Sequence, residues 1–359
     1  MLKYKPDFDR AKKYWSAFWQ KEIIDRPIVV VRSPKKDMQY IFPKISSPYN
    51  YTRSLDGCIE KVFEDYEAMA ERMYFGGEAI PFIDVGFGPD QFGAMFGSRI
   101  EPMHAEETTW VHAVIDDLSE FSPKLDRSKD GVFARLKEFY EVGARMSEGK
   151  YLLSALDMHS NLDALSALRG PQNLCFDLMD CEDEVIRVTK EFGKFYPEII
   201  EMMRTAGNME ARGSIAWLAT YLEKGKFCVT QCDFSALISP EQAKKHLIPA
   251  LREEVDYLDH TIYHYDGKEA LGHVDDILDI EGIDAIQWCP GSGNPRSIEW
   301  MDLLHKIQSK NKGLWLYDWT VEEIKSRFKE LKPEGLVFEV YVGSEDEADE
   351  LLEYLVKHM

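Results

Sequence analysis

Several patterns that mark common classes of protein are missing from this sequence. It has no run of eighteen apolar residues, which excludes a transmembrane helix, and its polar start lacks the apolar stretch of a signal peptide. Its six cysteines form no CxxC pair, which argues against a zinc knuckle or a thioredoxin-like centre. In a long chain without an export signal they are expected to be free thiols. We therefore expect a soluble, cytoplasmic protein.

Positive charge is also scarce, because 43 basic residues face 64 acidic ones and the formal net charge is −21. Such a surface repels phosphate backbones and anionic membranes, so neither nucleic acid nor a membrane is expected as a partner. Hydrophobic residues make up 45% of the 359 residues, which is ample for a large core. Length alone would suggest about two domains, but single α/β barrels also reach this size.

Short apolar runs alternate with amphipathic stretches along nearly the whole chain. Consecutive apolar residues are typical of strands buried on both faces. The eight runs are residues 28–31, 79–83, 151–153, 227–229, 261–263, 285–288, 314–317 and 336–338. Helical patterns cover residues 181–207, a segment that opens at Ser239-Pro240-Glu241, and residues 296–310, 319–331 and 344–357.

Eight buried strands favour a closed parallel barrel, because closure leaves no exposed edge. The predicted fold class is α/β, a (β/α)8 TIM barrel that forms one domain over residues 1–359. Residues 1–25 are expected to form an N-terminal helical extension, and loop excursions are expected at residues 33–55 and 98–130. An open doubly wound sheet is the alternative, but no GxGxxG follows the first strand.

Polar residues that directly follow the apolar runs are the site candidates, because the active site of a parallel barrel lies at the C-terminal ends of its strands. These residues are Arg32, Asp84, Asp157 with His159, Asp233, His264 with Asp266, Cys289, Asp318 and Glu339. For Asp157, Asp233 and Asp318, helix capping or loop hydrogen bonding is an equally good interpretation.

The segment Tyr263-His264-Tyr265-Asp266-Gly267 is the most informative. Residues two apart in a strand point to the same side, so His264 and Asp266 can offer a nitrogen and an oxygen to one divalent metal ion such as zinc. Glu339 is the preferred third ligand, because the last strand of a closed barrel lies beside the first, and Cys289 is the alternative. Without a metal, His264 would hydrogen-bond a neighbour or transfer protons.

Substrate-binding residues are expected near the same strand ends. The candidates are Arg32, Asp157, His159, Tyr263, Trp288 and Tyr317. For the aromatic members, packing in the core or at the mouth of the barrel is the alternative explanation.

Five segments, in order along the chain, resemble the uroporphyrinogen decarboxylase superfamily. They are residues 81–93, 162–180, 233–249, 264–267 and 281–285. The Ser239-Pro240-Glu241 segment combined with His264-Tyr265-Asp266-Gly267 is the most specific part. The resemblance implies a (β/α)8 barrel, often in a homodimer, and two broad activities.

The decarboxylases of this family act without a cofactor, and an Arg-rich N-terminal loop holds their acidic substrate. Here that loop offers only Arg32 followed by Ser33-Pro34-Lys35-Lys36. The methyltransferase branch moves a methyl group between a corrinoid protein and a small compound, with zinc held by His-x-Cys and a later Cys. In this sequence His264 matches, Asp266 stands in place of the Cys, and the third position falls near Glu339.

Replacing thiolates by carboxylates makes the donor set harder and leaves more positive charge on a metal. Such a site suits an O- or N-methyl donor better than thiol methylation. The resemblance therefore implies a metal-dependent methyltransferase in which His264 is catalytic and Asp84 and Asp233 position the methyl donor. The chain has no D-x-H-x-x-G segment of its own, so a separate partner protein would supply the corrinoid.

Two other functions stay open. One is a metal-free decarboxylase or lyase that uses Asp84 or His264 as acid and base. The other is a barrel that binds a small molecule without catalysis.

Overall fold

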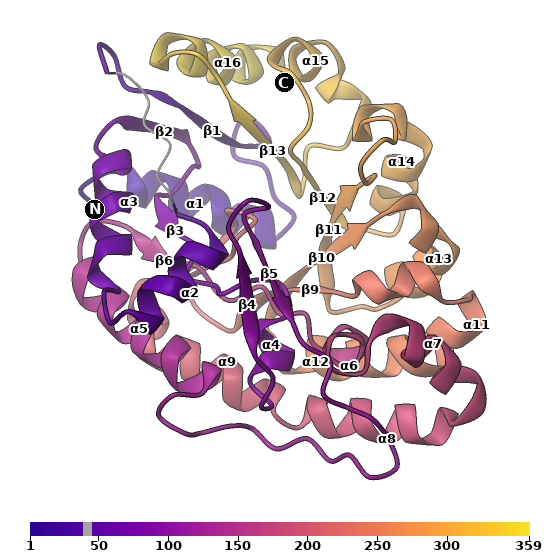
Figure 1. Ribbon diagram of the computed structural model, residues 1–359. Coiled ribbons are helices and arrows are strands. Elements are labelled where there is room, and N and C mark those ends of the chain that lie inside the picture. The colour runs from indigo at the N-terminus through magenta and orange to yellow at the C-terminus, as the bar shows by residue number, and fades with distance from the viewer. Residues whose placement is uncertain (39–44) are drawn as a thin grey trace.

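The computed structural model describes residues 1–38 and 45–359, and its helices form an outer ring around the strands (Figure 1). The strands are β1 (Ile28–Pro34), β2 (Met73–Gly77), β3 (Phe82–Ile83), β4 (Ile100–Met103), β5 (Thr108–Val111), β6 (Leu152–Leu153), β7 (Ser214–Ile215), β8 (Tyr221–Leu222), β9 (Phe227–Gln231), β10 (His260–Asp266), β11 (Ile283–Cys289), β12 (Gly313–Leu316) and β13 (Leu336–Tyr341). The α-helices are α1 (Phe8–Trp19), α2 (Ser47–Leu55), α3 (Glu60–Ala70), α4 (Gln91–Ala94), α5 (Val132–Met146), α6 (Asn161–Arg169), α7 (Pro171–Asp180), α8 (Glu182–Gly193), α9 (Tyr196–Ala206), α10 (Met209–Arg212), α11 (Pro240–Gln242), α12 (Ile248–Tyr257), α13 (Val274–Leu278), α14 (Met301–Ser309), α15 (Val321–Arg327) and α16 (Glu345–His358). Shorter 3-10 or π-helical turns are η1 (Asp233–Leu237), η2 (Ala243–Leu247), η3 (Lys268–His273), η4 (Ser297–Glu299) and η5 (Phe328–Glu330).

A seven-stranded sheet lies at the centre of the molecule, in the order β2-β1-β13-β12-β11-β10-β9. Every neighbouring pair from β1 to β9 is parallel, and only β2 runs antiparallel. Val29, Val30 and Val31 of β1 are fully buried, which confirms the prediction of strands covered on both faces. The fold is therefore α/β with a mostly parallel central sheet.

The sheet does not close into a cylinder within the described residues. No ladder joins β2 to β3, and none joins β7 to β9. β3 pairs only with β6, and one parallel bridge between Ser154 and Ile215 links β6 to β7. The predicted closed barrel is therefore not found as one hydrogen-bonded sheet, because antiparallel β2 occupies the edge of β1 where a second parallel strand would pair.

Helix starts in the second half agree with the sequence. The Ser239 hydroxyl accepts a hydrogen bond from Gln242 N at 3.3 Å, with Pro240 in the first turn. The Ser344 hydroxyl accepts from Glu347 N at 3.2 Å and opens α16. The predictions of helices that begin at these two points are confirmed.

Three predictions need correction. The helix predicted over residues 181–207 is two helices, α8 and α9, because Pro197 in the first turn of α9 has no N–H to continue a helix. The loop predicted over residues 33–55 contains α2, and its residues 39–44 lie outside the described residues. The loop predicted over residues 98–130 contains the hairpin β4–β5.

The segment before β1 is joined to the sheet by buried polar contacts. The Trp15 indole on α1 donates to Glu78 O at 3.0 Å, and the Trp19 indole donates to Tyr221 O at 2.8 Å. Arg26 forms two hydrogen bonds with the Glu78 carboxylate, of 2.6 and 2.8 Å, and both side chains are fully buried. One hydrophobic core, from Leu2 to Leu355, includes α1.

The helices within residues 1–38 and 45–359 include none that is both long and apolar enough to cross a membrane.

Candidate functional site

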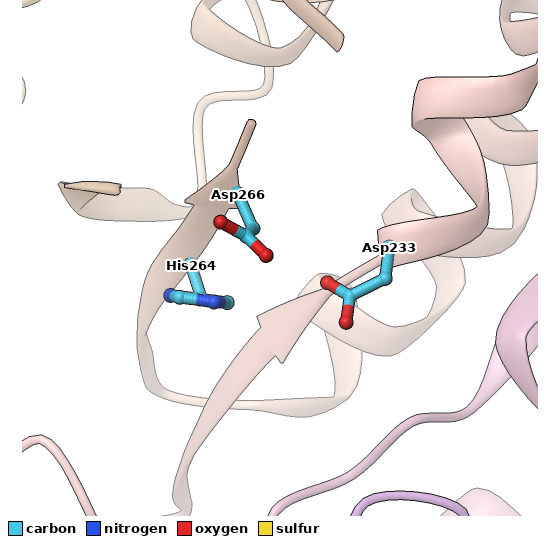
Figure 2. Close-up of side chains that lie close together, drawn as sticks. All are labelled: Asp233, His264 and Asp266. Carbon is cyan, nitrogen blue, oxygen red and sulfur yellow. The ribbon is translucent and has the colours of Figure 1, made fainter. Parts of the chain in front are cut away.

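The most prominent group of site candidates lies where β9 and β10 end. His264 and Asp266 lie on one face of β10, and Gln231 of the parallel neighbour β9 pairs with His264. The chain leaves β9 two residues later at Asp233, which brings this carboxylate beside the other two side chains. Figure 2 shows the three side chains turned toward a common space.

One ligand atom from each of Asp233, His264 and Asp266 lies within 4.8 Å of the others. The sequence had placed Asp233 among the catalytic residues and had preferred Glu339 as the third ligand. The structure instead puts Glu339 in an ion pair with Arg32, so its carboxylate is already engaged by a guanidinium and is not part of this group.

Cys289, the alternative ligand, is close to the group without belonging to it. It pairs with Asp266 in the register of β10 and β11, and its Sγ lies 3.1 Å from Tyr317 Oη. Burial raises the pKa of the Cys289 thiol, and Asp266 raises it further. The neutral thiol is therefore favoured, and a neutral thiol is a poor metal ligand.

His264 is oriented by a residue that sequence reasoning overlooked. Gln287 Oε1, on the neighbouring strand β11, lies 2.5 Å from His264 Nδ1. A carbonyl oxygen only accepts, so Nδ1 donates in this bond and Nε2 is the ring nitrogen left for a metal. The Trp217 ring packs edge-on against the imidazole at a centroid distance of 5.1 Å, which further fixes the ring. The sequence did offer a signal for this role, because Gln287 is a polar residue within the otherwise apolar run of residues 285–288.

Asp233 is held by a second overlooked residue, Asp163 on α6. The Asp163 carboxylate, which is 4% exposed, accepts hydrogen bonds from Asp233 N at 3.0 Å and Phe234 N at 2.8 Å. Burial raises the pKa of Asp163 to about 6. These two bonds fix the backbone that carries the Asp233 side chain.

His159 lies among carboxylates on the same side of the site. Its Nε2 is 3.4 Å from Asp157, and its Nδ1 is 3.5 Å from Asp163 and 3.9 Å from Asp233. Burial lowers the pKa of His159, but the carboxylates, above all Asp157, outweigh it and raise the pKa to about 10. His159 is therefore a buried cation that offsets the negative charge around it.

Asp84 and Asp157 follow β3 and β6, which are paired with each other. Asp84 Oδ1 accepts from the Ser154 hydroxyl at 3.0 Å and from Gly86 N at 3.1 Å. Asp84 remains accessible to solvent, although the surrounding protein raises its pKa. Asp157 accepts from Gln231 Nε2 at 2.7 Å. Burial favours its protonated form, but His159 outweighs that effect and lowers the pKa.

The remaining substrate-binding candidates separate into two sets. Tyr263 and Trp288 lie on the opposite face of their strands from His264 and are buried, Trp288 against Trp300 beneath the helices. The structure therefore places them in the core, away from the group formed by Asp233, His264 and Asp266. Tyr317 is exposed beside Cys289.

Two recesses adjoin the group. One of about 300 Å³ is lined by Asp90, His159, Asp163 and Asp233, among others. The second, of about 210 Å³, contains Arg32 and Glu339 and reaches Trp217. A larger cavity of about 610 Å³ lies beneath α1 and is lined by none of the predicted site residues.

If a divalent metal binds at this group, replacing Asp163 by asparagine is expected to weaken its binding by about 10- to 100-fold, because one of the two carboxylate oxygens that accept from Asp233 N and Phe234 N is lost. Titration with Co²⁺, followed by its visible absorption, measures the affinity. Asp177→Asn is the matched control, since Asp177 is also buried and is paired with Arg169 at 2.6 Å elsewhere. Equal losses of affinity in both variants would contradict a specific role for Asp163.

A comparison with solved structures finds a methyltransferase from Methanosarcina mazei, with a TM-score of 0.63. The match covers 97% of this chain and 98% of that chain, at 13% sequence identity. At this identity the likeness concerns the fold alone. No protein-family model matches the sequence, and a search of curated proteins also gives no match.

Proposed function

We propose that this protein is a metal-dependent methyltransferase that moves a methyl group between a small O- or N-methyl compound and a corrinoid carried by a separate protein. The observation that carries the proposal is the group formed by Asp233, His264 and Asp266, whose ligand atoms lie within 4.8 Å of one another. The similarity of the fold to a methyltransferase adds support.

The three side chains fit a divalent cation. Two carboxylates lie close together, and within the described residues His159 is the only cationic side chain within 4 Å of either. Like charges at this separation favour a cation between them. Ligands bonded to zinc at 2.0–2.2 Å lie roughly 3.4 Å apart, so side-chain movements of about 1 Å complete the site.

We also propose that the strands follow the order of a (β/α)8 barrel, in which β3 and β6 complete the ring that the seven-stranded sheet begins. The succession of parallel pairs from β1 through β13 to β9 supports this interpretation. In such a ring the ends of β9 and β10 belong to the active-site face.

A metal held here would supply Lewis acidity toward the oxygen or nitrogen that carries the methyl group. Asp233, Asp266 and His264 Nε2 hold it, and Gln287 keeps the imidazole in the required tautomer by accepting from Nδ1. Asp84 faces solvent near Asp157, and we assign it the positioning of the methyl donor. The buried cation His159 limits repulsion among the carboxylates.

The first test is elemental analysis of protein purified without chelators. We expect about one zinc per chain in the wild type and almost none in His264→Ala. His260→Ala is the matched control, because His260 lies on the same strand and pairs with Asp284 at 3.2 Å, outside the group. Retention of metal by His264→Ala would contradict the site.

A second pair of variants tests whether Asp233, or Glu339 as preferred on sequence grounds, is the third ligand. Asp233→Asn is expected to lower metal content, and Glu339→Gln is expected to leave it unchanged. The metal-loaded wild type should then methylate free cob(I)alamin from an O- or N-methyl donor, measured by the change in the corrinoid spectrum. Absence of metal from every protein would instead favour the decarboxylase or the non-catalytic alternative.

A further inference from the structure

A second feature near His264 is a recess of about 210 Å³ at the place where the sheet fails to close. It is bordered by β1, β2, β3, β13 and α3, and Trp217 forms its remaining side. The ladder of the seven-stranded sheet ends at antiparallel β2, and β3 pairs only with β6. Its aromatic lining consists of Tyr66, Phe75, Phe82, Trp217 and Tyr341.

The recess and the metal-ligating group are direct neighbours. Trp217 lines the recess and packs against the His264 ring at 5.1 Å between centroids. A molecule bound in the recess would therefore contact Trp217, whose ring in turn packs against the proposed metal ligand His264.

The recess contains one buried donor without an acceptor in the described part of the chain, beside a guanidinium that uses only one of its nitrogens. Arg32 Nη1 donates to Glu339 and to Tyr341 Oη, and no acceptor for its Nη2 lies among residues 1–38 and 45–359. The buried indole N–H of Trp217 also has no acceptor among the described residues. A buried donor without an acceptor is costly, so the Trp217 N–H points to an acceptor atom on a ligand, and the Arg32 guanidinium offers a further donor. The ion pair between Arg32 and Glu339 leaves the walls nearly neutral.

We propose that this recess binds a planar aromatic ring that carries a hydrogen-bond acceptor. Aromatic walls favour a ring through stacked or edge-on contacts, and a cavity of about 150 Å³ is enough for benzene. The recess of about 210 Å³ thus holds one substituted ring. If the proposed function holds, on which this step rests, the methyl donor is an aromatic O- or N-methyl compound.

Calorimetric titration of the full-length, metal-free protein tests the inference, with 4-methoxybenzoate as the probe. We expect one saturable site, with at least tenfold weaker binding of cyclohexanecarboxylate and of methoxybenzene, which lack the aromatic ring and the carboxylate acceptor respectively. Phe82→Leu should weaken binding of the probe by about tenfold, because it keeps an apolar side chain and removes the ring contact.

Tyr341→Leu is the second variant, since Tyr341 is 63% exposed and its loss leaves the core intact. Trp110→Leu, which removes an exposed aromatic ring outside the recess, is the control and should bind as the wild type does. Equal binding of the aromatic and saturated acids, or wild-type affinity in both recess variants, overturns the inference. Ring binding by a protein that takes up no metal would contradict only the proposed function, and metal binding without ring binding would contradict only this inference.

Discussion

Replacing Arg26 by methionine is expected to lower the free energy of unfolding by about 3–5 kcal/mol. Arg26 and Glu78 are paired with no exposure to solvent, and Glu78 Oε2 also accepts from Val29 N at 3.0 Å. Removal of the guanidinium leaves a buried carboxylate without its counter-charge. Unfolding by urea, followed by circular dichroism, measures the loss as a fall in the midpoint concentration.

A double variant distinguishes loss of charge balance from loss of packing. Arg26→Met combined with Glu78→Gln removes both charges and keeps an acceptor for Val29 N, so it should recover most of the stability. The exposed pair of Arg127 and Glu198, at 2.7 Å, provides the matched control, and Arg127→Met should cost less than about 1 kcal/mol. A double variant as unstable as Arg26→Met would show that the charge is not the cause.

Glu254→Gln is expected to remove a large dependence of stability on pH. Glu254 lies on α12 with 4% exposure, and the Asn161 amide donates to its oxygens at 3.2 and 3.3 Å. Burial raises its pKa to about 8, against 4.5 for an ordinary glutamate. Between these values the unfolded chain has released a proton that the folded chain keeps, so the wild type loses stability as pH rises. At about 1.4 kcal/mol per pH unit the loss reaches about 3–5 kcal/mol.

Urea unfolding at pH 5 and at pH 8 provides the measurement. Wild type and Glu254→Gln should be similar at pH 5, and the variant should be more stable at pH 8. Glu253→Gln is the control, because Glu253 is the exposed neighbour on the same helix. A stability difference between wild type and Glu254→Gln that is the same at both pH values would contradict the raised pKa.

The second half of the fold could be predicted from sequence because each of its elements carries a local signal. Strands β9 to β13 are apolar runs, and residues such as Ser239 and Ser344 mark where helices begin. The antiparallel pairing of β2 has no such signal. It depends on contacts between residues of β1 and β2 that are about forty positions apart in the chain, and these contacts end the ladder at β2.

The site was predictable where it depends on one strand. The spacing of His264 and Asp266 placed both on one face of β10, as the structure has them. The identity of the third residue of the group, Asp233, depends on which neighbouring strand ends beside β10. Glu339 was preferred instead because its ion pair with Arg32 could not be predicted from either residue alone. The role of Asp163 in holding Asp233 could not be predicted either, because its hydrogen-bond partners are backbone N–H groups about seventy residues later in the chain.

The parallel pairing of β1 with β13 has a consequence for synthesis of the chain. Arg32 and Glu339, whose side chains form an ion pair across these two strands, are separated by 307 residues. One edge of β1 therefore emerges from the ribosome long before its partner exists, while β2 can cover the other edge early. Pairing over such a separation is slow, and an uncovered strand edge attracts other chains. Chaperone protection during translation should therefore matter most for β1, and translational pauses before residue 336 should increase aggregation.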